Sequence, residues 1–144
     1  MFNFFKKKTT NNLIKALTEF EKLNSFEFSQ LDIVFEKHPI IEIFHSGFVD
    51  SWGMDIETKP DGLILFIVFS EEKPNNEIYL NNFKKSSIFK KVKRSYQLFP
   101  DKKTYYYNFP NRKDIDLIER DIYIFLTEIY KIESSDFFNI YIRN

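Results

Sequence analysis

The longest apolar run in the chain, Gly62–Phe69, is the feature that most strongly limits what the chain can fold into. Its sequence, GLILFIVF, has the length of a buried strand and falls far short of the roughly 20 apolar residues of a membrane span. A strand without a polar face lies inside a sheet that is covered on both sides. We therefore expect a central strand over residues 63–70.

The segment before this strand predicts its partner. Residues 53–58 alternate apolar and acidic side chains, as in a strand with one face toward solvent. The following Lys59-Pro60-Asp61-Gly62 has the composition of a turn, because proline presets one dihedral angle and glycine accepts a positive φ. The sequence thus predicts a β-hairpin over residues 53–70.

Hydrophobic periodicity predicts the other elements. We expect helices over residues 12–24, 76–85 and 114–132, and strands over residues 31–36, 40–45, 104–109 and 138–142. His38-Pro39 is expected to break the chain between the first two strands. Residues 88–98 fit either a helix or a strand, and we favour a helix to about residue 90 and a strand over 92–99.

These elements predict one α+β domain over residues 1–144, with an antiparallel sheet of about five strands packed by the N-terminal and C-terminal helices. Residues 1–9 are expected to form a flexible leader. The expected core comprises Leu65, Ile67, Phe69, Ile118, Ile122, Phe125 and Ile129.

Composition excludes several classes of site. The chain has no cysteine, which rules out disulfides, thiolate metal sites and cysteine nucleophiles. Three glycines are too few for a glycine-rich phosphate loop, and neither nucleotide-binding glycine motif occurs. The start lacks the order of a secretory signal, and no apolar stretch has the length of a span. We expect a cytoplasmic chain without a cofactor or a metal.

Charge is balanced overall but separated along the chain. The 21 basic and 21 acidic residues cancel. Residues 18–80 hold 13 acidic and four basic residues, whereas residues 81–113 hold ten basic and one acidic. Such a chain can fold with charged surfaces of opposite sign, which steer it toward charged partners.

The acidic segment contains the preferred candidate for a binding surface. Its members are Asp50, Trp52, Asp55, Glu57 and Asp61. The acids can meet a basic protein, and Trp52 is the only tryptophan, a residue type enriched at interface hot spots. The alternatives are ordinary solubilising charge and a tryptophan that folds back over the core.

The basic segment is the alternative binding surface. Its cations are Lys84, Lys85, Lys90, Lys91, Lys93 and Arg94, interleaved with aromatic residues. Such a pattern can hold single-stranded nucleic acid through phosphate contacts and base stacking. The acidic remainder of the chain would repel nucleic acid, so we expect a protein partner instead.

His45 is the one candidate for chemistry. Together with Asp50 and Asp55 it can in principle hold a metal or act as a base. Ser46 is its neighbour, but adjacent residues of a strand point to opposite faces, which suits a nucleophile and its base poorly. We therefore expect no catalytic residue and no enzyme.

The order of elements resembles two groups of small bacterial proteins. The Phe- and Lys-rich start, the helix over 12–24, the strand meander and the closing helix after Tyr105–Pro110 resemble immunity proteins of contact-dependent toxin systems. They also resemble secretion-chaperone domains of the type III and YbjN-like kind. The resemblance implies a non-enzymatic protein-binding domain, either an immunity protein that neutralises a toxin or a chaperone-like adaptor. It carries over no site residue and leaves the oligomeric state open.

Overall fold

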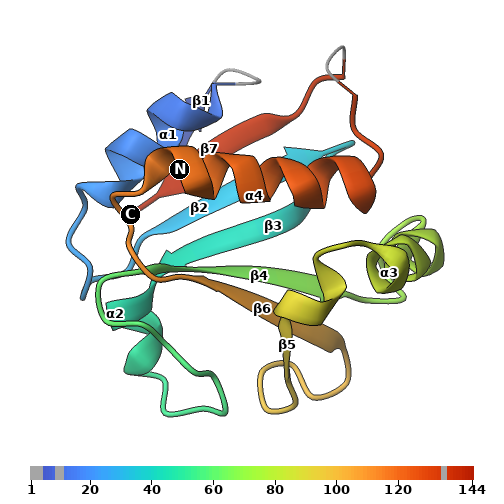
Figure 1. Cartoon of the computed structure of the whole chain (residues 1–144), viewed down its shortest axis with the longest axis horizontal. Helices are drawn as coiled ribbons and strands as arrows, with labels where there is room; N and C mark the ends of the chain where they lie inside the picture. Colours follow the sequence, from blue (N-terminus) through green and yellow to red (C-terminus); the bar gives the residue numbers. More distant parts are fainter. Residues whose placement is uncertain (1–4, 9–11, 134–135) are drawn as a thin grey trace.

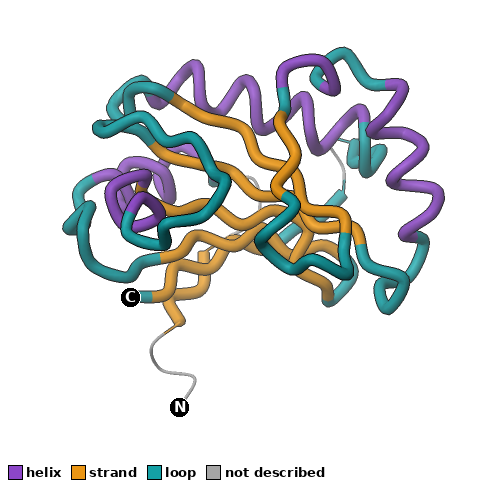
Figure 2. The backbone as a smooth tube through the Cα atoms, turned by 90° about the horizontal axis from the view of Figure 1, so that it is seen from below, coloured by secondary structure: helices purple, strands orange, loops and turns teal. Residues whose placement is uncertain are grey.

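The computed structural model describes residues 5–8, 12–133 and 136–144. Seven antiparallel strands form one open sheet in the order β1-β7-β2-β3-β4-β6-β5. Figure 1 shows α1 and α4 lying across the strands, and Figure 2 shows the strands as one twisted layer. The expected α+β domain with an antiparallel sheet is confirmed, although the sheet has seven strands where about five were expected.

The strands are β1 (Phe5–Lys8), β2 (Gln30–Phe35), β3 (His38–His45), β4 (Leu63–Phe69), β5 (Lys93–Ser95), β6 (Lys103–Phe109) and β7 (Asn139–Arg143). The apolar run forms β4, which pairs with β3 on one side and β6 on the other. Six of its seven residues are buried, as expected of a strand that is covered on both faces.

The helices are α1 (Leu13–Glu21), α2 (Ser46–Asp50), α3 (Asn76–Lys85) and α4 (Ile115–Glu128), with a 3-10 turn η2 (Phe89–Lys91). The buried residues of α1 recur at helical spacing and face the sheet, as do those of α4. All seven expected core residues lie in the resulting main core. Asp114 occupies the N-cap position of α4, but its side chain makes no capping hydrogen bond.

The opposite face of the sheet carries a second, smaller core. Its buried members are Phe44, Val49, Ile64, Phe66 and Tyr106, and α2 and residues 51–62 cover it. The two hydrophobic faces of β4 thus serve two separate layers. Leu65 faces the main core, and Phe66 faces the second core.

The predicted hairpin over residues 53–70 is wrong. Residues 53–58 form no strand but cross the second core as a loop, and the neighbours of β4 are β3 and β6. The backbone of this loop forms hydrogen bonds with side chains, where a strand would pair with a neighbouring strand. Gln97 Oε1 accepts from Asp55 N at 2.9 Å, and the hydroxyl of Tyr106 accepts from Glu57 N at 3.1 Å.

Two smaller predictions also need correction. The chain turns at Glu36 and Lys37, both with positive φ, and His38-Pro39 already belongs to β3. This is the geometry of a two-residue hairpin turn. The ambiguous segment does change from η2 to a strand, as favoured, but β5 ends at Ser95 rather than at residue 99.

The expected leader contains part of the sheet. Residues 5–8 form β1, which pairs with β7, while residues 1–4 and 9 lie outside the described residues. β1 is therefore one edge of the sheet, and β5 is the other. Within the described part of the chain, no helix has the length and apolar character needed to cross a membrane.

Candidate functional site

Four aromatic side chains line up on and beside α2. We call Phe26, Phe28, Phe48 and Trp52 the aromatic surface. The ring centroids of Phe28 and Phe48 lie 5.8 Å apart, and those of Phe48 and Trp52 lie 5.9 Å apart, both edge-to-face. Such geometries are favourable for aromatic pairs. The rings of Phe28, Phe48 and Trp52 therefore form one connected strip, and Phe26 lies against Gly47 of α2 beside it.

Phe26 is the most exposed member, with 76% of its surface open to solvent. Its position is nevertheless held by the chain, because Phe26 N donates to Asn24 Oδ1 at 2.9 Å. The turn packs on α2 at Gly47, where a Cβ would lie 2.9 Å from Ser25 O and 3.1 Å from the Phe26 ring. A glycine in α2 thus permits the close approach that places Phe26 on the surface.

Trp52 lies at the inner end of the strip. Its ring stacks on Phe66 at 6.0 Å and meets Phe44 edge-to-face at 5.4 Å, so it folds over the second core and stays only partly exposed. This is the position expected if Trp52 folds back over the core, the alternative to a binding anchor. Sequence pattern could not single out Phe26 and Phe28, because exposed and buried phenylalanines look alike in a chain with 18 of them.

Two of the candidate acids hold the loop in place. Asp55 accepts from Ser95 Oγ at 2.6 Å and from Tyr96 N at 2.8 Å. These hydrogen bonds lower the pKa of Asp55, the one from Ser95 most. Glu57 pairs with Lys93 at 2.6 Å, and this hydrogen bond lowers the pKa of Glu57. Asp55 and Glu57 therefore connect the loop to β5, and Lys93 belongs to this contact.

The other two candidate acids lie at the ends of α2. Asp50 ends the helix, is exposed, and accepts from Thr58 Oγ1 at 3.0 Å. Asp61 precedes Gly62, whose carbonyl accepts from Ser46 N at the start of α2. The Asp61 carboxylate is 89% exposed and lies 3.8 Å from Arg112. Glu27, next to Phe26, is also exposed, so acids surround the aromatic surface.

A polar cluster lies on the same face of the sheet, beside Phe44. Gln30 Nε2 donates to Asp32 Oδ1 at 2.6 Å and to Glu42 Oε2 at 3.1 Å, and Arg143 lies 3.2 Å from Asp32. Burial raises the pKa of Asp32. Burial and the nearby Asp32 raise the pKa of Glu42. The cluster extends the acidic character of this face onto β2 and β3.

The basic segment gathers at the end of α3, in η2 and along β5. Lys84 and Lys85 end α3, and Lys90 and Lys91 lie in η2. All four are exposed, and no carboxylate of the described residues pairs with them. Arg94 in β5 lies with its guanidinium 4.6 Å from the centre of the Tyr96 ring. The structure thus brings five of the six basic candidates to one region.

His45 is separated from its expected partners. It is fully buried at the end of β3, and its Nε2 lies 2.9 Å from Phe20 O. Burial lowers the pKa of His45. Among the residues that the structure describes, Nδ1 of His45 and Oγ of Ser46 find no hydrogen-bond partner. Within the described part of the chain, no three histidine or acidic side chains gather as a metal site would require.

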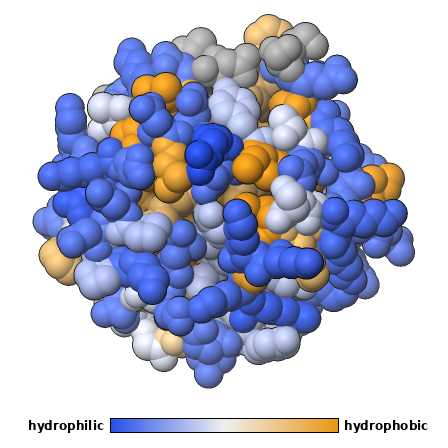
Figure 3. Space-filling view, viewed as in Figure 1, coloured by the Kyte–Doolittle hydropathy of each residue, from blue (hydrophilic) through white to orange (hydrophobic). Residues whose placement is uncertain are grey.

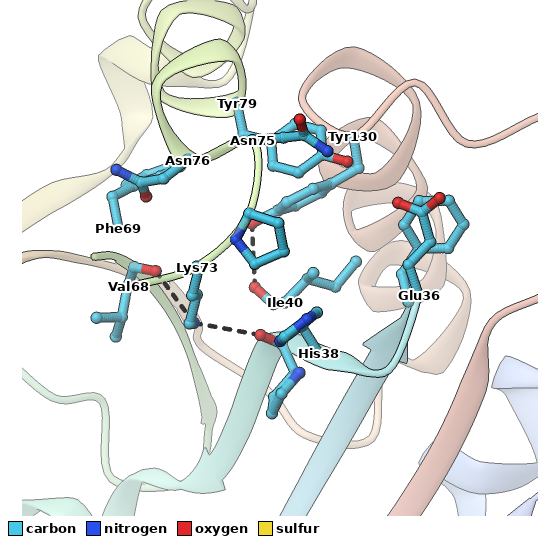
Figure 4. A pocket seen from close by; sticks show the side chains of 13 residues that line it. Glu36, His38, Ile40, Val68, Phe69, Lys73, Asn75, Asn76, Tyr79 and Tyr130 are labelled. Atoms are coloured by element: carbon cyan, nitrogen blue, oxygen red, sulfur yellow. Dashed lines mark hydrogen bonds between the residues drawn. The ribbon is translucent and has the colours of Figure 1, made fainter. Parts of the chain in front are cut away.

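A small pocket opens between β3 and the start of α3 (Figure 4). Its volume is about 40 Å³, which is room for only a few water molecules. Lys73 Nζ crosses it and donates to Pro39 O at 3.2 Å and to Val68 O at 3.3 Å. Tyr130 donates to Ile40 O at 3.2 Å. These groups tie the elements together, and their donors are already used.

An open groove lies on the other side of this turn, between α3 and residues 101–103. Acidic and basic side chains alternate along it, among them Glu77, Asp101 and Lys103. Four acidic and three basic side chains line the groove, beside Phe69, Ile78 and Leu80. The two signs nearly balance, so the charge of the groove does not select one class of ligand. The aromatic surface and the basic segment are therefore the stronger candidates.

Comparison with known proteins returned no relative: no family model, no curated protein and no solved structure matches this chain. The candidates accordingly rest on the geometry of the chain itself.

Proposed function

We propose that the chain is a non-enzymatic protein-binding domain that neutralises a toxin by direct binding through the aromatic surface. The observation that carries this proposal is Phe26, a large apolar side chain with 76% exposure on a turn that the fold holds in place. Aromatic anchors of this kind dominate the binding energy of protein interfaces. A turn that is already ordered also loses little conformational entropy when a partner binds.

The continuity of the strip supports a protein rather than a small molecule as the partner. Phe26, Phe28, Phe48 and Trp52 follow one another across the surface instead of lining a cavity. Protein interfaces combine such an apolar centre with a polar rim. Figure 3 shows the rest of one face as mainly hydrophilic, with separate hydrophobic patches.

Charge around the aromatic surface indicates the sign of the partner. Glu27, Asp50 and Asp61 are exposed around it, and Glu42 lies on the adjoining part of the sheet. A basic partner would be steered toward this rim. Asp55 and Glu57 contribute less to this contact, because Ser95 and Lys93 already bind their carboxylates.

A secretion-chaperone-like adaptor is the second candidate. It would use the same surface, because chaperones of this class also hold an apolar segment of another protein. The two functions differ in their consequence: an immunity protein abolishes the activity of the bound toxin, whereas an adaptor leaves its cargo active and is required for its export.

The proposal is tested by protection. Production of the protein encoded immediately upstream should stop growth of cells, and the wild-type chain should restore it. The variant Phe26→Ala/Phe48→Ala should fail to protect them, although it accumulates as a folded protein. The matched control is Ile78→Ala, which removes an apolar side chain of 58% exposure on α3.

Three results would contradict the proposal. One is protection that survives the double substitution. Another is loss of protection by Ile78→Ala alone. A third is a wild-type chain that neither protects cells nor binds the neighbouring gene product. If the chain binds that product and promotes its export without reducing its activity, the chain is an adaptor instead.

A further inference from the structure

The cations at the β5 end of the sheet form a surface that the proposed function does not use. We call Lys84, Lys85, Lys90, Lys91, Arg94 and Tyr96 the basic surface. It is displayed by the end of α3, by η2 and by β5. Figure 1 shows α2 and α3 at opposite ends of the strands, whereas β5 contacts the loop after α2 through Asp55 and Glu57. The lysines of α3 and η2 are therefore the part of this surface that lies apart from the aromatic surface.

One aromatic cluster beneath the surface sets the positions of the lysines. The rings of Phe83 and Phe89 lie 5.1 Å apart, and the Phe83 ring lies 4.8 Å from Tyr105. Two lysines directly follow each of these phenylalanines in the sequence. The packed rings therefore bring the backbone positions of the two lysine pairs together, although four residues separate the pairs in the chain.

The positive charge of this surface is not neutralised from within. No described carboxylate lies within ion-pair distance of the four lysines or of Arg94. Glu128 reaches the region from α4, but Ser87 binds it through its N and its Oγ. Lys93 is the exception among the basic candidates, since it pairs with Glu57. Among the described residues, the surface thus holds five cations without an ion pair and two nearby carboxylates, Glu128 at Ser87 and Asp55 at Tyr96 N. The remaining excess of positive charge favours a polyanion.

Tyr96 adds a feature that an acidic protein would not require. Its ring is 68% exposed, and the Arg94 guanidinium covers one face at 4.6 Å from the ring centre. The guanidinium and the ring thus form a flat platform beside the four lysines. Stacking of bases on aromatic and guanidinium planes is how single strands are held without sequence preference.

We propose that the basic surface binds single-stranded nucleic acid, with Lys84, Lys85, Lys90 and Lys91 contacting phosphates and the Arg94–Tyr96 pair stacking a base. Edge strand β5 suits this use because it is short and basic, which disfavours pairing with a strand of another protein. The chemistry is common to RNA and DNA, and the two are separated by experiment.

The test is fluorescence anisotropy with labelled 20-nucleotide oligo(dT) and oligo(rU) at several salt concentrations. Four phosphate contacts would give a slope of log K against log salt of about −2.8. Tyr96→Ala should weaken binding by roughly 5- to 100-fold with the slope retained. Lys84→Gln/Lys85→Gln/Lys90→Gln/Lys91→Gln should bring the slope close to zero.

The matched control changes the same number of charges elsewhere. Lys22, Lys37, Lys59 and Lys131 are exposed on other elements, and their replacement by glutamine should leave the slope and the affinity nearly unchanged. Circular dichroism checks that every variant is folded. Tighter binding of oligo(rU) than oligo(dT), or the reverse, identifies which nucleic acid the surface prefers.

The following outcomes would overturn the inference. One is the absence of an anisotropy change at 50 mM salt, and another is an equal loss of affinity in the control variant. A third is an affinity that Tyr96→Ala leaves unchanged. The last is binding of polyglutamate as tight as that of the oligonucleotides. The last result would assign the surface to an acidic protein. None of them bears on the aromatic surface, so the two proposals stand or fall separately.

Discussion

Gly62 lies where β4 begins, and a Cβ atom on it would stand 2.0 Å from the backbone oxygen of Phe109. Because backbone cannot move aside as a side chain can, we expect Gly62→Ala to lower the free energy of unfolding by about 3 kcal/mol. Gly53 is the matched control. It has φ +66° and open space around it, so Gly53→Ala should cost only about 1 kcal/mol of backbone strain. Urea denaturation measures both, and equal losses would contradict the packing at Gly62.

A second residue-scale feature is the buried imidazole of His45. Its ring packs against Phe20 at 4.6 Å, and its Nδ1 has no hydrogen-bond partner within the part of the chain that the structure describes. Burial lowers the pKa of His45 below 6.5, an effect that Arg112 reinforces, while the hydrogen bond to Phe20 and the charge of Glu21 act in the opposite direction. The folded protein therefore favours the neutral ring.

This preference predicts a pH dependence of stability. Below about pH 6.5 the unfolded chain binds a proton at His45 that the folded chain does not, so the free energy of unfolding falls as the pH decreases. His45→Gln has no titrating group and should lose this part of the slope between pH 7.5 and pH 5. Denaturant titrations of both proteins measure it, and the difference between them removes the contribution of Asp32 and Glu42. Identical slopes would show that His45 does not titrate as the structure implies.

At the scale of elements, the loop over residues 51–62 lacks regular secondary structure and is held by hydrogen bonds from side chains. Tyr106, Gln97 and Asn108 bind its backbone, and Asp55 and Glu57 reach back to β5. These contacts replace the strand pairing that residues 53–58 lack. The loop is therefore a cover for the second core that depends on a few polar groups.

Asp55→Ala tests this dependence. It removes the acceptor for Ser95 Oγ and Tyr96 N, and amide hydrogens of residues 53–58 and 96–98 should exchange faster while those of β4 stay protected. Asp61→Ala, on the same loop but with an exposed carboxylate, should leave exchange unchanged. Because the pKa of Asp55 is lowered, the wild-type loop should also open as the pH falls below about 3.8. Uniform protection in both variants would contradict the role of Asp55.

The sequence predicted elements well where local pattern decides them. α1, α3 and α4 and strands β2, β3, β4, β6 and β7 lie where periodicity indicated. Residues 53–58 failed because the same alternation suits a loop whose Ile56 packs on the second core. The groups that hold this loop come from residues 93–108, and no local window contains that information.

The candidate site was predictable only in part. Charge segregation pointed to the basic region, which the fold does gather. The acidic set looked uniform in sequence, yet Asp55 and Glu57 are engaged within the fold and Asp50 and Asp61 are largely exposed. The exposure of Phe26 could not be predicted from the sequence, because it depends on a tertiary contact, the packing of its turn on Gly47.

At the scale of the whole molecule, one continuous core holds the two ends of the sheet together. Phe125 of α4 is fully buried in it and meets the Tyr107 ring at 5.7 Å. Phe125→Ala should lower the free energy of unfolding by about 3–5 kcal/mol, because it removes a large side chain and leaves a cavity. Thermal or urea unfolding measures this. A loss below about 1 kcal/mol would mean that α4 is not packed as described.

The distribution of surfaces over the molecule gives the account its central claim. Acids and aromatic rings surround α2, and the lysines of α3 and η2, which have no ion pair among the described residues, lie away from it. A molecule with charge distributed in this way can approach a basic protein in one orientation. In the proposed complex the aromatic surface would supply the binding energy, with Phe26 as its most exposed anchor.

The most direct test is an equilibrium titration of the proposed partner, the product of the gene immediately upstream, with the wild-type chain, Phe26→Ala and Ile78→Ala under identical conditions. Ile78 lies on α3, and Phe26 lies against Gly47 of α2. Both side chains are exposed, so neither change should disturb the fold. The account predicts that Phe26→Ala weakens binding by at least about 30-fold, as expected of a hot spot, and that Ile78→Ala changes it by less than about twofold. Equal affinities of the wild-type chain and Phe26→Ala would contradict it.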